Sequence, residues 1–475
     1  MACLIAAPAS GSGKTLLSLS LIAWGRSRGH TVQPFKVGPD YLDPQLLGAA
    51  AGRPCRNLDL PLCGEAWVHD CFHGHGGLSQ LSLVEGVMGL FDGIGPTSEG
   101  SSAAIARQLN LPVVLVVDAG GQAQSLAALV RGFQLHDPEL HFAGVVLNRV
   151  STPRHRQLMQ EVLDGIGVPL LGCLPRSHDL ELPSRHLGLA PAHEIAAFQH
   201  RLEAWASLAQ QHLNLEALLP LLQAPDPGLD PVQRQLNRQP SPLPLTPRPV
   251  AVARDQAFHF RYPEMQDWLD ALAMPVLPWQ PLADEDLPKE ACGLILPGGF
   301  PELHAQALSQ CEHSLESLRQ WFGHKPIYAE CGGMLLLGQS LTDPAGNSHA
   351  MAGILPFHAR KGRLQVGYRQ LEASSDGLVL KRGETLTGHE FHRWELSEES
   401  PPESVGNLRS LWHVEGWQVA RRREGWNHPS LHASWVHLHW GGSWTISCRW
   451  RAAVDSAAAQ TAVDSLPARN PGLKR

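Results

Sequence analysis

Near its start the chain carries the stretch Ala7-Pro8-Ala9-Ser10-Gly11-Ser12-Gly13-Lys14-Thr15, which decides how the surrounding residues fold. The apolar run Ala2–Ala7 leads into it, and the amphipathic run Leu16–Arg28 follows it. A strand, a glycine-rich turn and a helix in that order gather backbone N–H groups and the positive end of a helix around one point. The stretch therefore predicts a phosphate-binding loop between a buried strand and a helix.

The residues of this loop have separate expected tasks. Gly11, Ser12 and Gly13 are expected to turn their N–H groups toward phosphate oxygens. Lys14 is expected to reach the β- and γ-phosphates of ATP, and Thr15 to offer its hydroxyl to Mg²⁺. The alternative is a glycine-rich turn with an incidental lysine.

An acid ends the strand predicted at Leu81–Glu85, and glycines follow it as far as Gly93. An acid at the carboxyl end of a parallel strand lies at the same sheet edge as the phosphate loop. Glu85 is therefore a candidate Mg²⁺ ligand, and Asp92 is a second acid for the same site. Without the loop, both acids are as well explained as solvated loop residues.

A third polar loop is Lys36-Val37-Gly38-Pro39-Asp40-Tyr41-Leu42-Asp43-Pro44. Its two acids lie three residues apart beside a lysine, and proline and glycine restrict its backbone. A rigid loop of this kind is able to orient Mg²⁺, a γ-phosphate and an incoming carboxylate. On spacing alone an ordinary turn is the better interpretation, so a more specific signal is needed to assign this role.

The length of 475 residues predicts two domains, because one hydrophobic core seldom supports so long a chain. Residues 1–192 alternate short apolar runs with amphipathic ones, which is typical of an α/β fold with a mostly parallel sheet covered on both faces. Residues 193–248 are expected to form a helical segment and a proline-rich linker. A second α/β domain is expected over 249–450, richer in strand toward its end, and a disordered tail over 451–475.

The composition argues against several classes of protein. A formal net charge of -7 gives no general attraction to nucleic acid or to an anionic membrane. No apolar run reaches the roughly 20 residues of a membrane helix, and Met1–Ala7 lacks the features of a signal peptide. The nine cysteines are scattered without a Cys-x-x-Cys pair, so we expect separate thiols and a cytoplasmic protein. The oligomeric state stays open, with a homodimer as one option.

A cysteine in the second half stands in the setting of a nucleophile. Residues Ile327–Met334 place Cys331 at a predicted strand-to-helix turn, where a helix N-terminus favours the thiolate. Upstream, Leu294–Glu302 reads as a strand followed by a glycine turn. The N–H groups of Gly298, Gly299 and Gly332 are candidates for an oxyanion hole. Without that glycine turn, a buried structural thiol is the better interpretation of Cys331.

A base is needed beside the thiol. Residues 434–440 offer His437 and His439 on one face of a probable strand, and either one is able to deprotonate Cys331 and later protonate ammonia. Spacing does not choose between them. His389 and His392, around an intervening glutamate, are expected to form a polar surface or substrate-side cluster.

Several longer segments extend these motifs: Gly52-Arg53-Pro54, Asn57-Leu58-Asp59, Glu85–Gly93, Leu182–Leu189, Val250–Asp255, and Cys331 with its glycines. Together with Lys36–Pro44, they resemble the cobyrinate a,c-diamide synthase family of corrinoid (vitamin B12) biosynthesis, over roughly residues 3 to 450. The resemblance implies an N-terminal P-loop domain similar to dethiobiotin synthetase. It also implies a C-terminal domain similar to triad-type (class I) glutamine amidotransferases.

The resemblance carries roles to individual residues. It implies ATP and Mg²⁺ at Lys14 and Thr15, and it matches Asp40, Asp43, Glu85 and Asp92 to acids implicated in metal binding and carboxylate activation. Thr15, Glu85 and Asp43 are the expected metal ligands. Tyr41 and Leu42 match positions associated with corrinoid binding. Cys331 matches the glutaminase nucleophile, and the family's aromatic-x-His pattern favours His437 over His439 as its base.

Several positions depart from the expected patterns. Leu47 stands where a histidine usually follows the Asp-Pro pair, so that substrate contact is not carried over. Pro8 stands where the common phosphate loop has its first glycine, which leaves that backbone contact open. Many glutaminases have a glutamate two residues after the base, where this chain has His439, so no third member of a triad is assigned.

The expected reaction follows from these parts. ATP would phosphorylate the a and c acetate carboxylates of cobyrinate, and ammonia released from L-glutamine would convert each acyl phosphate to an amide. Hydrogenobyrinate, the metal-free analogue, is the alternative substrate. A P-loop ATPase that partitions DNA or positions division machinery is the alternative from another class, and the Cys331 domain and the Lys36–Pro44 loop argue against it.

Overall fold

The computed structural model describes residues 2–150, 152–176, 198–238, 245–399 and 407–464, together with the backbone of two short strands at 184–185 and 188–189. The chain forms two compact units, Met1–Arg234 and Gln235–Arg475. This boundary falls within residues 193–248, where the sequence predicts a helical segment and linker. Each unit has its own sheet and its own core.

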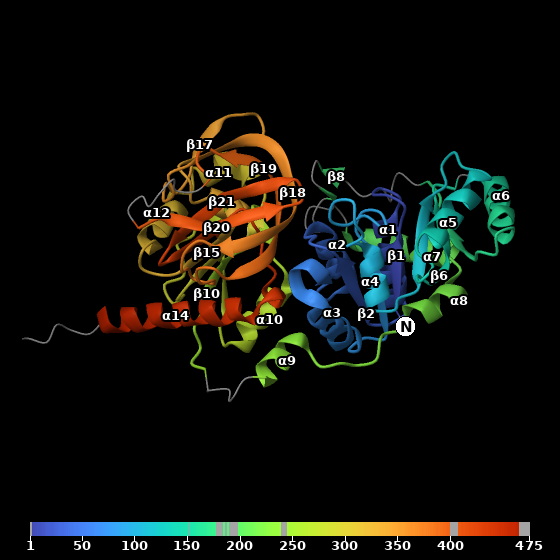
Figure 1. Ribbon diagram of the computed structural model, residues 1–475, viewed down its shortest axis with the longest axis horizontal. Helices are drawn as coiled ribbons and strands as arrows, with labels where there is room; N and C mark the ends of the chain where they lie inside the picture. Colours follow the sequence, from blue (N-terminus) through green and yellow to red (C-terminus); the bar gives the residue numbers. More distant parts are fainter. Residues whose placement is uncertain are drawn as a thin grey trace, which may run out of the picture. The chain divides into compact units, whose positions relative to one another are not determined.

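The first unit is built on a sheet of seven parallel strands in the order β3-β2-β4-β1-β5-β6-β7 (Figure 1). Strands buried on both faces read as continuous apolar runs, and Val113–Val117 is such a run. The predicted parallel α/β fold is confirmed. The strands are β1 (Cys3–Ala6), β2 (Val32–Val37), β3 (Arg56–Leu58), β4 (Leu81–Glu85), β5 (Val113–Asp118), β6 (Phe142–Asn148) and β7 (Leu170–Cys173).

Helices cover both faces of this sheet. Ile5, Leu83 and Val114 pack with the first and seventh helices, whereas Leu115 and Val117 point to the opposite face, toward the fifth and sixth. Figure 1 shows the fifth and sixth helices side by side at one end of the sheet. The helices are α1 (Lys14–Ser27), α2 (Leu42–Ala51), α3 (Leu60–Gly76), α4 (Ser102–Gln108), α5 (Ser125–His136), α6 (Pro153–Asp164), α7 (Phe198–His212), α8 (Leu215–Leu218), η3 (Leu219–Leu222) and α9 (Pro231–Asn237).

The strand order decides which loops meet. β1 lies between β4 and β5, and β2 lies on the far side of β4. Since all of these strands are parallel, the residues that follow β1, β2 and β4 emerge at one edge of the sheet. The three polar segments noted in the sequence therefore lie together.

The second unit contains a mixed sheet in the order β12-β10-β13-β15-β22-β21-β20-β18-β16-β17, with β19 paired to β18. The first five strands are parallel, and the long strands after β22 pair mostly in antiparallel fashion, which confirms the predicted strand-rich later part. The strands are β10 (Val250–Ala253), β11 (Phe258–Phe260), β12 (Val276–Trp279), β13 (Leu294–Leu296), β14 (Gly298–Gly299), β15 (Ile327–Glu330), β16 (Ser340–Thr342), β17 (Ser348–Ala350), β18 (His358–Ala373), β19 (Thr385–Leu396), β20 (Arg409–Gly416), β21 (Val419–His428) and β22 (Leu431–Ser434).

Helices pack against the parallel part of this sheet around one apolar core. In α12, Leu315, Leu318 and Trp321 repeat at helical spacing and face that core. The helices are α10 (Pro263–Ala271), η4 (Pro281–Ala283), η5 (Pro301–His304), α11 (Ala305–Leu308), α12 (Glu312–Trp321), α13 (Gly332–Leu335), η6 (Trp440–Gly442) and α14 (Trp444–Asp464).

The predicted disordered tail, 451–475, needs correction. Residues 451–464 continue α14, and 465–475 lie outside the described residues. The Ala-rich composition of this segment favours helix. Arg451 also ties α14 to the unit, because its guanidinium donates hydrogen bonds to the carbonyls of Leu272 and Thr246. Of the motif Leu182–Leu189, only the paired backbones of β8 (Ser184–Arg185) and β9 (Gly188–Leu189) are described.

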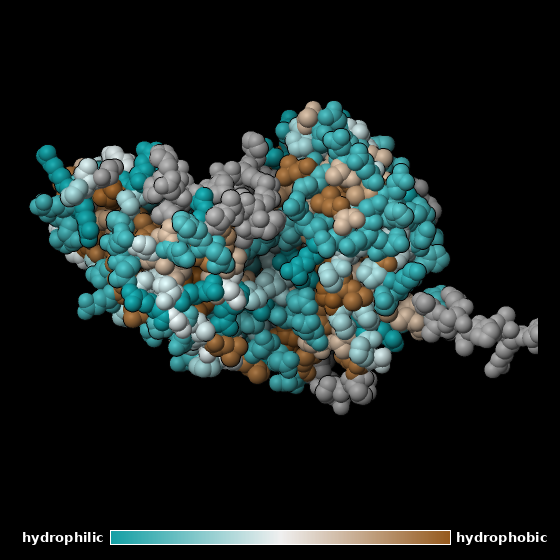
Figure 2. Space-filling view, turned by 180° about the vertical axis from the view of Figure 1, so that it is seen from behind, coloured by the Kyte–Doolittle hydropathy of each residue, from teal (hydrophilic) through white to brown (hydrophobic). Residues whose placement is uncertain are grey.

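In the part of the chain that the structure describes, no helix is long and apolar enough to cross a membrane. In the view of Figure 2, hydrophilic residues cover most of the described surface, and hydrophobic residues form small separate patches.

Candidate active sites

The loop between β1 and α1 has the backbone that a phosphate site requires. Gly11 and Gly13 have φ angles of 77° and 114°, which favour glycine. Asn148, at the end of β6, donates a hydrogen bond from Nδ2 to the Ser12 carbonyl at 3.0 Å. A Cβ atom on Gly13 would overlap that amide. The loop is therefore fixed from β6 as well as from its own strand.

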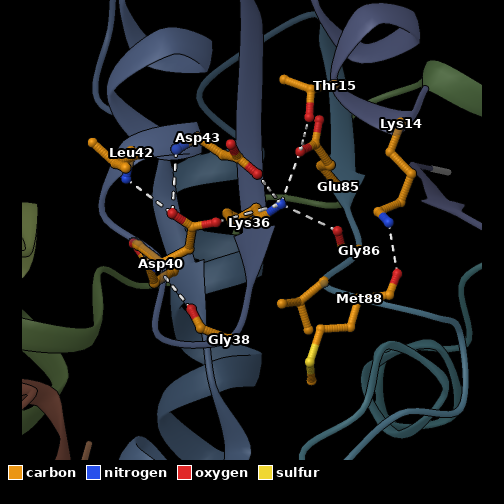
Figure 3. Close-up of polar contacts among 12 residues, drawn as sticks. Lys14, Thr15, Lys36, Gly38, Asp40, Leu42, Asp43, Glu85, Gly86 and Met88 are labelled. Carbon is orange, nitrogen blue, oxygen red and sulfur yellow. Dashed lines mark hydrogen bonds and ion pairs between the residues drawn. The ribbon is translucent and has the colours of Figure 1, made fainter. Parts of the chain in front are cut away.

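Lys14 and Thr15 start α1, and in Figure 3 Lys14 points toward the Met88 carbonyl and Thr15 toward Glu85. Lys14 Nζ donates to the Met88 carbonyl at 2.6 Å, and Thr15 Oγ1 donates to Glu85 Oε1 at 3.0 Å. Burial and the positive charge of Lys36 lower the pKa of Lys14 to about 8, although the negative charges of the nearby acids act in the opposite direction. A lysine with so little hydration has few water contacts to lose when it meets a phosphate.

Lys36, near the end of β2, is the centre of an acidic cluster (Figure 3). Its ammonium lies 2.6 Å from Asp43 Oδ2, 2.8 Å from Glu85 Oε1 and 3.8 Å from Asp40 Oδ2. Burial alone would lower the pKa of Lys36, but the charges of Asp43, Glu85 and Asp40 raise it well above its usual value. The lysine therefore stays charged and balances the acids.

The Asp40–Asp43 loop is held by short-range hydrogen bonds. Asp40 Oδ1 accepts from the N–H groups of Leu42 at 2.9 Å and Asp43 at 3.2 Å. Asn57 Nδ2 donates to the carbonyls of Gly38 and Asp40, which explains why Asn57 belongs to the motif. Burial and the charge of Asp43 raise the pKa of Asp40 to about 7. Burial also acts on Asp43, but the charge and hydrogen bond of Lys36 outweigh it and lower the pKa of that carboxyl.

Three other predicted residues lie near this cluster and differ in how far they are exposed. Asp92 is exposed and accepts a hydrogen bond from the Gly89 N–H at 2.8 Å, so it shapes the loop after β4 and acts on Lys14 only through its charge. Tyr41 and Leu42 start α2 and are buried, with 8% and 7% of their surfaces exposed.

In the second unit, Cys331 lies in the sharp turn between β15 and α13, as predicted. Its φ of 48° and ψ of -111° are unusual for a residue with a side chain, and such strain is typical of functional turns. The turn depends on small neighbours, because a Cβ on Gly332 would lie 2.8 Å from Pro301 Cδ and one on Gly333 would overlap the Leu296 carbonyl. The Cys331 N–H donates to the Ser434 carbonyl at 2.7 Å, which ties the turn to β22.

The glycines predicted for an oxyanion hole lie around this turn. Gly298 and Gly299 form β14, which pairs with β11, so they form a short strand and not the tight turn that the sequence suggested. A Cβ on Gly332 would lie 3.0 Å from the Gly299 nitrogen, and one on Gly298 would lie 2.5 Å from His437 Cε1. The three glycines therefore lie close together, beside Cys331 and His437.

The two candidate histidines have different surroundings. β22 ends at Ser434, so they do not share the face of a strand as the sequence suggested. His437 interacts with Cys331 and with Glu330, whose Oε2 lies 3.4 Å from His437 Nδ1. His439 Nε2 lies 3.4 Å from Glu264 Oε2, and its ring packs against Tyr262. The geometry favours His437 as the base.

β19 crosses beside the nucleophile. His389 and His437 exchange backbone hydrogen bonds at 3.0 and 2.8 Å, and the Phe391 carbonyl lies 3.9 Å from Cys331 Sγ. His389, Glu390 and His392 are buried, so the expectation that this segment forms a polar surface is wrong. Glu390 there accepts hydrogen bonds from three cationic or polar side chains, namely Arg369, His392 and Arg422. This network fixes the path of β19 past Cys331.

Two family models match the chain. The CobQ/CobB/MinD/ParA nucleotide binding domain covers residues 3–189, and the CobB/CobQ-like glutamine amidotransferase domain covers residues 249–444. The first contains the phosphate loop, and the second contains the Cys331 turn. The two matched domains thus coincide with the two centres described above.

Similar proteins cover almost the whole chain. A cobyrinate a,c-diamide synthase of Synechocystis sp. is 40% identical over 95% of this chain and 93% of its own length. One from Gloeobacter violaceus is 41% identical over 93% of this chain and 94% of its own length. A hydrogenobyrinate a,c-diamide synthase of Streptomyces coelicolor is 40% identical over 94% of this chain and 96% of its own length. The chain belongs to the cobyrinate a,c-diamide synthase family.

Membership of the family makes the chain a glutamine-hydrolysing ligase with a nucleotide-binding unit. The predicted family, fold class and type of enzyme are confirmed.

The first unit offers a fitting place for Mg²⁺. Glu85 is fully buried, and among the described residues its Oε2 has no hydrogen-bond partner, although a buried carboxylate oxygen normally has one. Oxygen ligands at the start of a phosphate-loop helix suit Mg²⁺, which is usually held by one or two protein oxygens together with phosphates. Thr15 and Glu85 therefore fit as ligands, while Asp43 reaches the site through Lys36.

Three residues of these centres were missed by sequence reasoning. Lys36 was noted only as a neighbour of two acids, although its position in a buried strand already pointed to a charged core residue that needs partners. Asn148 gave a weaker signal, as a polar residue at the carboxyl end of an apolar strand. Glu330 stands directly before the nucleophile, and only the fold shows that it faces His437.

Proposed function

We propose that the chain converts the a and c acetate carboxylates of cobyrinate, or of hydrogenobyrinate, into carboxamides with ATP and glutamine. The observation that carries this proposal is one chain with two chemical centres, a phosphate loop with buried acids and a cysteine–histidine pair at a strained turn. Relatives of nearly the same length are named for this product with either corrinoid. Because ATP and glutamine are the co-substrates, we expect the reaction to take place in the cytoplasm.

At the first centre the carboxylate has to become a better electrophile. Transfer of the γ-phosphate of ATP to it gives an acyl phosphate with a good leaving group. Lys14, now on the Met88 carbonyl, would move to the phosphate oxygens. Mg²⁺ held by Thr15 and Glu85 would supply further positive charge for those oxygens. Lys36 keeps Asp43 in place and ionised beside them.

The substrate side of this centre is assigned to the Asp40–Asp43 loop. The raised pKa of Asp40, about 7, lets this carboxyl exist in a protonated form near neutral pH. A protonated carboxyl is able to donate a hydrogen bond to the substrate carboxylate, which a charged one would repel. Tyr41 and Leu42 would fix the position of the loop against α2 and so influence which acetate is presented.

At the second centre the thiolate of Cys331 attacks the side-chain amide of glutamine. The N–H groups of Gly298, Gly299 and Gly332 would stabilise the oxyanion, since their backbone surrounds the turn. The C–N bond breaks as His437 gives its proton to the leaving ammonia, and a thioester remains on Cys331. Water then hydrolyses the thioester to glutamate and restores the thiol.

The test is the full reaction with both corrinoids offered in competition. With glutamine and ATP–Mg²⁺, mass spectrometry should show two successive exchanges of a hydroxyl for an amino group in the preferred corrinoid. One ATP should become ADP and phosphate for each exchange. Unchanged corrinoids, with ATP turnover driven only by a protein or by DNA, would support a switch ATPase and contradict the proposal.

A further inference from the structure

The second centre contains a carboxylate where the sequence gave no reason to expect one. Many class I glutaminases have their third triad residue two positions after the histidine, and here that position is His439. His439 faces Glu264 and Tyr262. If His437 is oriented by an acid, that acid comes from another element.

Glu330, the last residue of β15, meets this requirement. It lies directly before Cys331 and is 3% exposed. Its Oε1 accepts hydrogen bonds from the Tyr328 hydroxyl at 2.5 Å and from the Leu438 N–H at 3.0 Å. Its Oε2 lies 3.4 Å from His437 Nδ1. Two donors thus fix Oε1 of Glu330, and Oε2 is directed at the imidazole of His437.

The charges around His437 indicate what its contact with Glu330 does. Burial lowers the pKa of His437, but the charge and hydrogen bond of Cys331, together with Glu330, raise it to about 10. The third titratable group facing the ring is His389 on β19, whose own pKa is lowered to about 3 by burial, so it is neutral. The imidazolium is therefore balanced by Cys331 on one side and by Glu330 on the other.

We propose that Glu330 is the positioning residue of the glutaminase centre and takes the place of the missing third triad member. By binding the Nδ1 proton it would hold the ring with Nε2 toward Cys331 and stabilise the positive charge that forms there. Glu330 touches neither glutamine nor the thioester and acts only through His437. This inference rests on the proposed function.

The chain supplies a matched control. Glu264 and His439 form a second buried pair, also at 3.4 Å, in the same unit. His439 Nδ1 accepts from the Gly441 N–H at 3.1 Å, so this pair supports η6. Glu264→Gln removes an equally buried charge without touching the environment of Cys331.

The experiment compares glutamine hydrolysis by the full-length protein and by Glu330→Gln, Glu330→Asp and Glu264→Gln. Glu330→Gln should lower kcat about 10- to 100-fold with KM for glutamine little changed, because the proton donor and not the binding site is disturbed. Its alkaline limb of kcat/KM should move to lower pH, since an imidazolium without its carboxylate loses its proton more readily. Glu330→Asp keeps the charge and should recover part of both effects.

Glu264→Gln should lower the Tm yet leave kcat and the alkaline limb unchanged. The inference is overturned if Glu330→Gln keeps both kcat and the pH profile of the unaltered protein. Where Glu330→Gln fails to fold, Glu330→Asp should still show a lower kcat, because its shorter side chain moves the carboxylate away from Nδ1, and an unchanged kcat and pH profile would overturn the inference. Glutamine hydrolysis that persists in the Cys331→Ser variant contradicts the proposed function as well. The two failures are therefore distinguishable.

Discussion

Lys36 places one buried positive charge among Asp40, Asp43 and Glu85. Three carboxylates this close repel one another strongly in a site with little water. The ammonium, 3% exposed, offsets that repulsion and leaves Asp43 ionised with a lowered pKa. One residue thus keeps Asp43 ionised beside the phosphate loop.

Replacing Lys36 by methionine should therefore cost more than an ordinary lysine substitution. We expect a loss of about 3–5 kcal/mol in the free energy of unfolding, because buried carboxylates lose their counter-charge. Without the lysine, burial would raise the pKa of Asp40 and Asp43 above the unfolded values, so the loss should be large at pH 8 and shrink toward pH 5 as these two acids bind protons. Urea denaturation at several pH values measures both effects.

Lys325→Met is the control for this prediction. Lys325 is half-buried and donates to the carbonyls of Lys289 and Ala291, and among the described residues it forms no ion pair with a carboxylate. Its replacement should cost about 1 kcal/mol, with no trend across the same pH range. Equal losses for the two variants would mean that Lys36 is an ordinary core lysine.

Single residues differ in how far their positions could be predicted from the sequence. Lys14 and Thr15 were predicted because the glycine loop, the strand and the helix are contiguous, so spacing alone specifies their geometry. Glu330 was not predicted, because its partner His437 lies 107 residues later. The direction of the Glu330 side chain also depends on how β15 pairs with β22. Asp92 was placed in the right loop, but its hydrogen bond to Gly89 is a local detail that spacing does not show.

At the scale of an element, the strand–turn–helix unit from β15 to α13 holds the nucleophile. The turn stores strain at Cys331, of the order of 1–3 kcal/mol, which the packing of Gly332 and Gly333 against β13 and β14 has to offset. Sequence reasoning found this element because glycines follow the cysteine directly. It did not find β14, since two glycines give no strand signal.

Gly333→Ala should damage both stability and catalysis. The new methyl group would overlap the Leu296 carbonyl, which is backbone and cannot turn away, so α13 would shift and carry Cys331 with it. We expect a loss of about 1–3 kcal/mol in stability and a fall in kcat for glutamine hydrolysis. Calorimetry and a glutaminase assay on the same samples measure the two.

The matched control is Gly132→Ala in α5. A Cβ there meets nothing within 4 Å, and alanine stabilises a helix interior by about 0.5–1 kcal/mol. It should therefore leave the Tm unchanged or slightly higher and the glutaminase rate unaltered. If Gly333→Ala behaves like Gly132→Ala, close packing does not hold the turn.

At the scale of the whole molecule, the described residues of each centre belong to a single unit. The phosphate loop, Lys36 and Glu85 come from strands of the first sheet, and the Cys331 turn and His437 from the second unit. This separation explains why motif spacing predicted both centres, since each unit resembles a known class of domain by itself. The two activities should therefore be separable by mutation.

The most direct test supplies corrinoid, ATP–Mg²⁺, glutamine labelled with ¹⁵N in its amide, and unlabelled ammonium, and follows the isotope in the product. The unaltered protein should place ¹⁵N in both new amides. Cys331→Ser should make the same diamide from unlabelled ammonium only, whereas Lys14→Met should make no diamide yet still hydrolyse glutamine. Labelled diamide from Cys331→Ser, or diamide from Lys14→Met, would contradict a division of labour between a thiolate and a phosphate-loop site.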